Sequence, residues 1–445
     1  MRDMTTGSIP QHMLRFTVPL IFGNIFQQLY NAVDALIVGR LIGKEALAAV
    51  GAAGAIMNVL LFIIAGMALG ASILIAQFYG AKDYDLLKRE MGTAVKAGSL
   101  FTVFMVVFAF SSSTSLLKLI NTPAEILPQA GQYLRIVILG LNFTFFYNIF
   151  SASLRALGNA KAPIQFLFIC ALLNAALDII FIKYFHMGVA GAALATVIAQ
   201  ATAALMCFIY IRYKTPLIKL AAKDVRIDYD LLRRTMQYGG IYAFQQSFLY
   251  IGYLLVQGAV NTLGINAMAA YNVVTKIDSF ALMAGGSLAD SLSTFVAQNK
   301  GAGHKERIIS SFKCATLIGF GYSIFLALLL PQVSGSLMGL FLESSEDKAI
   351  SLGVSYLRVM SFLYLLTVLC NSFQGFFRGL GYMRITLNAT AIQIPIRVAL
   401  SYTLISRFEL NAVPIATGVG WVMMIAYELY EFQRYRRNSR SASDE

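Results

Sequence analysis

Apolar runs of about 20 residues, the length that crosses ~30 Å of hydrocarbon as a helix, recur along nearly the whole chain between short polar segments. The pattern predicts twelve transmembrane helices in two sets of six. The first set covers residues 15–38, 52–78, 92–117, 132–154, 163–184 and 188–211, and the second covers 238–261, 267–298, 309–331, 353–376, 385–406 and 411–432.

An internal repeat supports the division into two sets. The aligned stretches are GKEALAAV (43–50) with GINAMAAY (264–271), AQFYGAKDYD (76–85) with AQNKGAGHKE (297–306), and NIFSASLRALG (148–158) with NSFQGFFRGLG (371–381). The offset is 221 for the first two pairs and 223 for the third. Because each set has an even number of helices, the two repeats should point the same way across the membrane. The predicted fold is an all-α integral membrane protein with two six-helix lobes related by pseudo-two-fold symmetry about the membrane normal.

We expect the N-terminal lobe to span 1–211 and the C-terminal lobe to span 238–432. A cytoplasmic linker, 212–237, is the longest polar connection, and we expect a solvated, partly helical surface segment there. The remaining residues, 433–445, form a cytoplasmic tail. Pro19 falls inside the first helix and predicts a bend that would move the residues after it. Gly66 and Gly70 are four apart in the second helix and allow close helix contact.

Composition and charge agree with this class. Hydrophobic residues make up 58% of the chain and charged residues only 13%, against roughly 25% charged in soluble domains. The net charge of +13 could suggest a nucleic-acid partner. However, with both termini on one side, the loops of that side hold 23 lysines and arginines and the opposite loops hold 6. The positive-inside rule therefore places both termini in the cytoplasm and explains the charge without nucleic acid.

Ionisable residues within apolar runs are functional candidates, since a charge at the bilayer centre costs at least ~2.5–3.5 kcal/mol. In the first half they reduce to Asp34 and Asp178. At 1.5 Å per residue these lie about 28 Å and about 22 Å from the cytoplasmic starts of their helices. Asn174 shares a helical face with Asp178, and Thr196 reaches a similar depth. These oxygens could bind Na⁺ or a proton; alternatively, Asp34 caps a helix end and Asp178 pairs with a basic neighbour such as Lys183.

The second half lacks this set. At the repeat offsets, Asp34 corresponds to Leu255, Asn174 to Arg397 and Asp178 to Ser401. The second half instead offers Lys276, Asp278 and Arg397 within its apolar runs. Asp278 and Arg397 are the obvious buried pair, and the three residues could either brace the helices or line a cavity.

The chain resembles the multidrug and toxic compound extrusion (MATE) family. The segment PLIFGNIFQQLYNAVDALIVGRLIGKEALAAVG (19–51) is similar to that family's first helix and following loop, and AQFYGAKD and AQNKGAGH are similar to the ends of its second and eighth helices. Asp34, Asn174, Asp178 and Thr196 match the cation site of the DinF-type branch. The NorM-type branch uses acids in helices 7 and 10, and neither helix here contains one, which argues against an ion site in the second half.

The resemblance implies a secondary active exporter, not an enzyme, that exchanges amphipathic organic cations for Na⁺ or H⁺ across the cell membrane. Direct use of ATP is not expected, because the sequence has no GxxxxGK[ST] loop. We expect no cofactor beyond the coupling ion, contact with membrane lipid, and a monomer. Related flippases of lipid-linked envelope or polysaccharide precursors have more basic cavities, so Lys276 and Arg397 keep that alternative open. The expected substrate cavity residues are Gln28, Tyr30, Lys276, Asp278 and Arg397.

Overall fold

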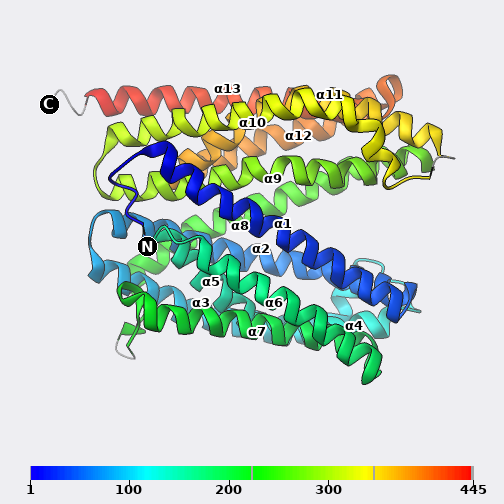
Figure 1. The fold of residues 1–445 in the computed structure, drawn as a ribbon, viewed down its shortest axis with the longest axis horizontal. Helices are drawn as coiled ribbons and strands as arrows, with labels where there is room; N and C mark the ends of the chain where they lie inside the picture. The colour runs from blue at the N-terminus through cyan, green and yellow to red at the C-terminus, as the bar shows by residue number, and fades with distance from the viewer. Residues whose placement is uncertain (1, 222–223, 344–345, 442–445) are drawn as a thin grey trace. The chain divides into compact units, whose positions relative to one another are not determined.

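The computed structural model describes the chain apart from residues 1, 222–223, 344–345 and 442–445. Its described part consists of helices and connecting loops (Figure 1). The first half contains α1 (Ile9–Leu41), α2 (Lys44–Gly80), α3 (Tyr84–Leu119), α4 (Leu127–Leu139), α5 (Leu141–Ala156), α6 (Lys161–Ile179), η1 (Ile180–Tyr184), α7 (Gly188–Lys214) and η2 (Pro216–Ile218). The second half contains α8 (Tyr229–Asn261), α9 (Ile265–Gly301), α10 (Lys305–Gly339), α11 (Asp347–Leu380), α12 (Met383–Phe408), η4 (Glu409–Asn411) and α13 (Ala412–Ser441).

All twelve predicted spans are helical in the described residues, and the all-α prediction is confirmed. By length and hydropathy alone, eight helical segments of the described chain qualify as membrane spans, or nine when the bent pair α4 and α5 counts as one. One of these segments, Met383–Asn438, contains both α12 and α13, while α1 and α8 are not among them.

The fourth predicted helix, 132–154, is wrong as a continuous element. It is divided into α4 and α5, which meet at a bend of 47°. Gly140 lies at the break, and its backbone N–H donates to the carbonyl of Val137 at 3.0 Å. A Cβ at Gly140 would lie 2.6 Å from Cγ2 of Val197 on α7, so the bend brings backbone and side chain into a contact that only glycine permits.

The repeat is also present in the backbone conformation. Gly43 and Gly264, which begin the first pair of aligned stretches, both have positive φ (123° and 88°) directly before α2 and α9. Gly158 and Gly381, which end the third pair, both have φ of 77° after helices α5 and α11. These are backbone conformations that L side chains rarely adopt, so the sequence repeat specifies equivalent turns in the two halves.

The chain divides into two compact units, which are described separately. The N-terminal unit comprises Met1–Met4 and Val18–Ala243, and the C-terminal unit comprises Thr5–Thr17 and Phe244–Glu445. The division differs from the expected lobes, because the start of α1 belongs to the C-terminal unit, and the linker and the start of α8 belong to the N-terminal unit. Within the N-terminal unit, α2 packs against α3, α4 and α5, and α7 packs against α4, α5 and α6.

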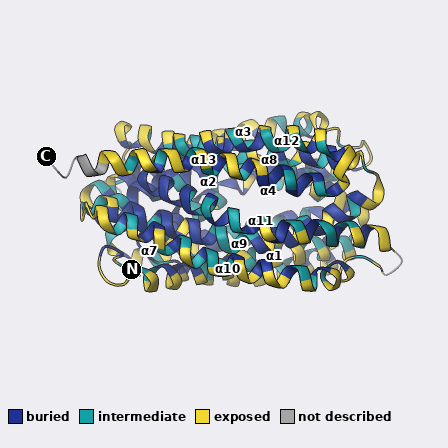
Figure 2. Cartoon of the chain, turned by 90° about the horizontal axis from the view of Figure 1, so that it is seen from above, coloured by how far each residue is buried: buried dark blue, intermediate teal, exposed yellow. Residues whose placement is uncertain are grey.

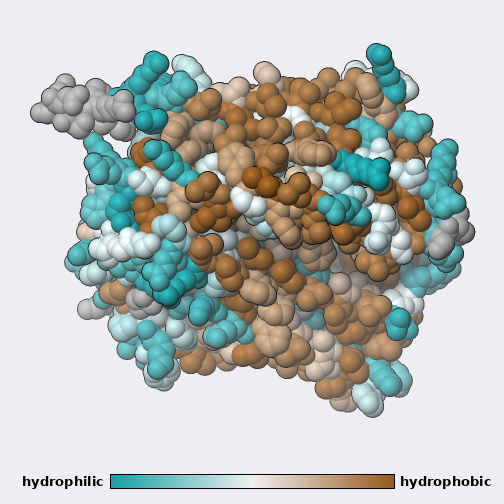
Figure 3. Space-filling view, turned by 45° about the horizontal axis from the view of Figure 1, so that its top comes forward, coloured by the Kyte–Doolittle hydropathy of each residue, from teal (hydrophilic) through white to brown (hydrophobic). Residues whose placement is uncertain are grey.

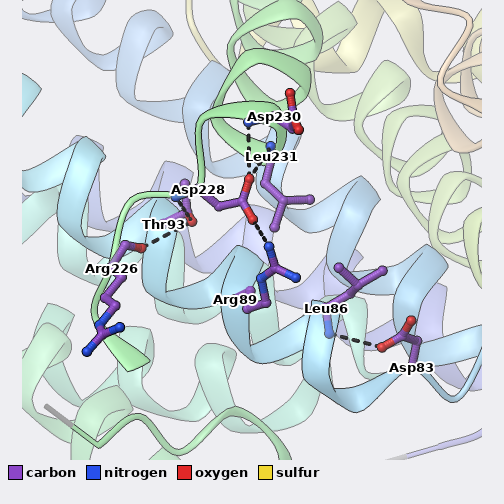
Figure 4. A network of polar contacts seen from close by, with 8 residues as sticks. All are labelled: Asp83, Leu86, Arg89, Thr93, Arg226, Asp228, Asp230 and Leu231. Carbon is purple, nitrogen blue, oxygen red and sulfur yellow. Dashed lines mark hydrogen bonds and ion pairs between the residues drawn. The ribbon is translucent and has the colours of Figure 1, made fainter. Parts of the chain in front are cut away.

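The linker is anchored to the start of α3 (Figure 4). Thr93 donates its hydroxyl to the carbonyl of Arg226 at 3.2 Å and accepts from the backbone N–H of Asp228 at 3.0 Å. Arg89 forms an ion pair with Asp228. The described part of the linker includes the short helix η2, and its residues 224–228 dock against α3.

The outer faces of the helices are apolar. Figure 2 shows exposed residues on the outward faces of helices such as α10, and buried residues where helices meet. On α3, Phe104, Val107 and Phe108 are 66%, 60% and 60% exposed, a degree of apolar exposure that suits contact with lipid. In Figure 3 hydrophobic side chains cover much of the middle of the visible face, and hydrophilic side chains gather toward its ends.

Candidate ion site in the N-terminal unit

Three helices of the N-terminal unit supply the predicted cation site. Asp34 lies on α1, Asn174 and Asp178 on α6, and Thr196 on α7. Spacing of four residues places Asn174 and Asp178 on one face of α6, and both are buried, at 1% and 0% exposed. Asp34 and Thr196 are partly buried. The four residues therefore approach one another from separate helices.

The Asn174 carboxamide joins α6 to α7. In the orientation that its neighbours require, its nitrogen donates to Oδ2 of Asp178 at 3.1 Å, and its oxygen accepts from the backbone N–H of Thr196 at 3.2 Å. The Thr196 hydroxyl donates to the carbonyl of Ala192 at 3.0 Å, so its oxygen keeps a lone pair for another partner. This arrangement holds the Asp178 carboxyl in one position.

The carboxyl groups of Asp34 and Asp178 lie within hydrogen-bonding reach of each other. Oδ1 of each residue is buried and has no hydrogen-bond partner in the described part of the chain. Two carboxylates that face each other repel unless a proton or a cation lies with them. The alternative partner for Asp178 is not seen, because Lys183 lies instead over the Tyr184 ring, 5.9 Å from its centroid.

Two tyrosines complete the surroundings, and the sequence analysis did not assign either to this site. The Tyr30 and Tyr133 hydroxyls both reach the Thr196 side chain. Tyr133 is only 8% exposed. The Tyr30 hydroxyl lies at the carboxylate cluster, and the expected role of Tyr30 in the substrate cavity stays a prediction. Its spacing of four residues from Asp34 was the sequence signal for this location.

A π-helical turn follows Asp178 directly. η1 covers Ile180–Tyr184, and the N–H of Phe185 donates to the carbonyl of Ile180 at 3.1 Å. Such turns are rare and occur often at functional sites, because they reorient the side chains beside them. Here the turn ends α6 one residue after the acid.

The other expected cavity residues are distributed over both units, and their role in a substrate cavity stays a prediction. Gln28 is exposed and belongs to the N-terminal unit, whereas Lys276, Asp278 and Arg397 belong to the C-terminal unit. The expected ion pair of Asp278 with Arg397 is wrong, since no ion pair joins them in the described residues. Instead, Asp278 accepts hydrogen bonds from the Tyr364 hydroxyl and, at 3.1 Å, from the Tyr356 hydroxyl.

Arg397 and Lys276 have aromatic neighbours. Arg397 lies within hydrogen-bonding reach of the Tyr271 hydroxyl, while its Nε is buried without a partner in the described residues. The Lys276 ammonium lies 5.6 Å from the centre of the Phe341 ring, and the residue is exposed. Buried tyrosine hydroxyls, which the sequence pattern could not place, therefore mediate the contacts of this acid and this arginine.

Comparison with known proteins decides the family. A sequence profile of the MatE family matches residues 19–180 and 242–403, and so covers each half of the chain once. The chain belongs to the MatE family. The two matched ranges are related by the same offset as the third pair of repeated stretches, so the family profile and the internal repeat divide the chain alike.

Individual MatE proteins are similar over most of their length. The chain is 29% identical over 363 residues to "Probable multidrug resistance protein YoeA" of Bacillus subtilis (strain 168), covering 80% of this chain and 78% of that protein. It is 24% identical over 420 residues to "Multidrug export protein MepA" of Staphylococcus aureus (strain MRSA252), covering 94% and 90%.

A solved structure confirms the MatE fold. A structure described as "Crystal structure of MATE in the bent conformation" superposes with a TM-score of 0.92 at 21% identity, covering 99% of this chain and 98% of that one. This likeness concerns the fold alone.

Proposed function

We propose that this MatE protein is a secondary active exporter that exchanges amphipathic organic cations for Na⁺ or H⁺. Its family membership and its relatives named for multidrug resistance and export support the direction and substrate class. The observation that carries ion coupling is the contact of Asp34 with Asp178, each with one buried, unpartnered oxygen.

The coupling ion would bind among oxygens. Asp34 and Asp178 supply charge, and the Thr196 hydroxyl supplies a neutral ligand. Asn174 fixes Asp178 through its N–H group, and its oxygen lies at the Thr196 backbone. Na⁺ prefers such hard oxygen ligands, and a proton shared between the two carboxyls would satisfy the same geometry. We assign the site to the DinF-type pattern on these residues.

Ion and substrate would each favour one arrangement of the protein. A ligand can shift such an equilibrium only by its difference in affinity for the two arrangements. A coupling free energy of about 1–3 kcal/mol would change affinity by ~5–150-fold, and the effect would be reciprocal. We place the protein in the cell membrane with both termini in the cytoplasm, on the basis of its loop charges, and we propose that it acts as a monomer.

The test is transport by purified protein in liposomes. A fluorescent lipophilic cation would be followed under a Na⁺ gradient and, separately, under a pH gradient. We expect Asp34→Asn and Asp178→Asn to abolish the dependence of transport on the ion gradient, because each variant removes one of the two charged ligands of the candidate site. Asp85→Asn, an exposed acid on α3 in the same unit, is the matched control and should transport normally.

Unchanged ion-driven transport in both carboxylate variants would overturn the assignment. Absence of cation export by the unsubstituted protein under either gradient, together with translocation of a lipid-linked precursor, would instead establish flippase activity. Export that depends on only one of the two gradients identifies the coupling ion.

A further inference from the structure

A second buried carboxyl lies in the C-terminal unit, away from the residues assigned above. Glu428 on α13 is 0% exposed, although it comes from an apolar run near the predicted cytoplasmic end. Its Oε2 has no hydrogen-bond partner in the described residues, and no ion pair involving it is found there. An ionised carboxylate without a positive partner is unfavourable in such a setting, so the group needs a bound positive charge.

A chain of hydrogen bonds ends at this carboxyl. Gln245 on α8 donates its Nε2 to Oε1 of Gln374 on α11 at 3.0 Å, and Gln374 donates its Nε2 to Oε1 of Glu428 at 2.6 Å. Both amides present an N–H toward the next acceptor, with Glu428 last. Because both of these donors point toward Glu428, the hydrogen bonds stabilise the negative charge that remains on this carboxylate when its cation leaves.

Neutral oxygens from α12 surround the same chain. The Thr390 hydroxyl accepts from Gln245 Nε2 at 2.7 Å and donates to the carbonyl of Thr386 at 3.0 Å. That carbonyl also lies 3.3 Å from Gln245 Nε2. Three helices therefore fix the amides that precede the carboxyl, and α13 packs against both α11 and α12.

Other titratable groups near the cluster provide no partner for Glu428. Cys370 on α11 lies close enough to interact electrostatically with the carboxyl. Arg378 donates its Nε to the backbone carbonyl of Gln374 at 3.3 Å, but its guanidinium pairs with Asp290 of α9 at 3.2 Å. The positive charge of Arg378 is thus already compensated by Asp290.

We propose that Glu428, positioned by Gln374 and Gln245, is a binding site for one monovalent cation, H⁺ or Na⁺, within the C-terminal unit. The seventh and tenth predicted helices contain no acid, and on that ground no ion site was expected in the second half. α8 and α11 occupy these places in the chain and contribute amides, and the acid comes from the twelfth span. A carboxylate can either be protonated or coordinate Na⁺ through its oxygens, so the site suits either ion.

The experiment measures binding by purified protein and needs no transported substrate, so it can succeed or fail independently of the proposed export. The background is Asp34→Asn/Asp178→Asn, which removes the two carboxylates of the candidate ion site in the N-terminal unit. One arm measures bound ²²Na⁺ at constant pH. The other measures protons released after a pH jump in Na⁺-free buffer. To this background we would add Glu428→Gln or, as the matched control, Glu431→Gln.

Glu431 is a suitable control because it lies on the same helix and pairs with Arg434 at 3.8 Å. We expect the background and its Glu431→Gln derivative to bind one more Na⁺, or to release one more proton, than the Glu428→Gln derivative. Equal binding by the Glu428→Gln and Glu431→Gln derivatives in both arms would overturn the proposal. So would a background that binds neither ion. Folding of each variant is checked by its thermal unfolding midpoint, and Glu428→Asp replaces Glu428→Gln if that variant is unstable, with weaker binding expected.

Discussion

The contact between α2 and the first part of α8 depends on glycine, and neighbouring glycines on α8 allow a controlled test. A Cβ built on Gly239 would lie 2.5 Å from the Gly66 carbonyl oxygen, whereas one on Gly240 would meet no atom within 4 Å. One turn further along α2, a Cβ on Gly70 would lie 2.4 Å from the Thr235 carbonyl oxygen. The expected close contact at Gly66 and Gly70 is therefore confirmed within the N-terminal unit.

We predict that Gly239→Ala destabilises the protein and that Gly240→Ala does not. Since Cβ atoms essentially never approach other atoms within 3.0 Å, α2 and α8 must move apart at Gly239 until the distance of 2.5 Å reaches at least 3.0 Å. The atoms that obstruct the new methyl belong to the backbone and cannot rotate away. Overpacking of this kind costs ~1–3 kcal/mol. Both substitutions gain about 0.5–1 kcal/mol of helix propensity, which cancels in the comparison.

The assay is thermal unfolding of the two purified variants in the same detergent. At about 2–4 °C per kcal/mol for a domain of 150–250 residues, the midpoint of Gly239→Ala should lie roughly 2–12 °C below that of Gly240→Ala. Equal midpoints would refute direct backbone contact between α2 and α8. A lower midpoint for Gly240→Ala would show that the exposed face of α8 carries the packing.

Two further predictions concern polar contacts of the N-terminal unit. Asp228 accepts from the backbone N–H groups of the first turn of α8, so Asp228→Ala should lower stability by ~0.5–2 kcal/mol, and Asp228→Asn, which still caps the helix, by less. Although burial opposes it, hydrogen bonding to Leu231 and Arg89 lowers the pKa of Asp228. The stabilisation that the Asp228 carboxylate provides is therefore present above about pH 4 and is lost as the pH falls through the lowered pKa. The thermal midpoint of Asp228→Asn should not show this decrease at low pH. Asn174→Leu keeps the branching of the side chain but removes the donor to Asp178, so it should cost about 1–3 kcal/mol in thermal stability and weaken ion binding. Unchanged ²²Na⁺ and proton binding would contradict the positioning role of Asn174.

Local sequence patterns predicted the helices and the repeat, because a long apolar run specifies a membrane helix and a glycine specifies a turn through residues that are adjacent in the sequence. The spacing of Asn174 and Asp178 similarly predicted their shared face, since four residues separate neighbours on any α-helix. The similar distances of Asp34 and Asp178 from the cytoplasmic starts of their helices were sufficient to predict that Asp34 belongs to the same site. These features require only the geometry of one helix.

Features that depend on packing were not predictable from the same patterns. The break at Gly140 reflects a contact with Val197, which is distant in sequence. Glu428 was not among the residues singled out from the sequence, and in the structure it is buried and accepts a hydrogen bond from Gln374 on a neighbouring helix. The sequence signal was an acid inside an apolar span, but only the tertiary structure distinguishes a buried carboxyl from one that reaches water.

Helix α1 provides a covalent link between the candidate ion site and the C-terminal unit. Its segment Thr5–Thr17 belongs to that unit, where Met13 accepts through its backbone carbonyl from Ser291 at 3.5 Å. From Val18 onward the helix belongs to the N-terminal unit, and Pro19, which removes one backbone hydrogen bond, follows at once. Asp34 lies beyond this proline on the same helix. An ion that fixes Asp34 against Asp178 would thus constrain the second segment of α1, and any bend at Pro19 would change the direction of that segment relative to the first.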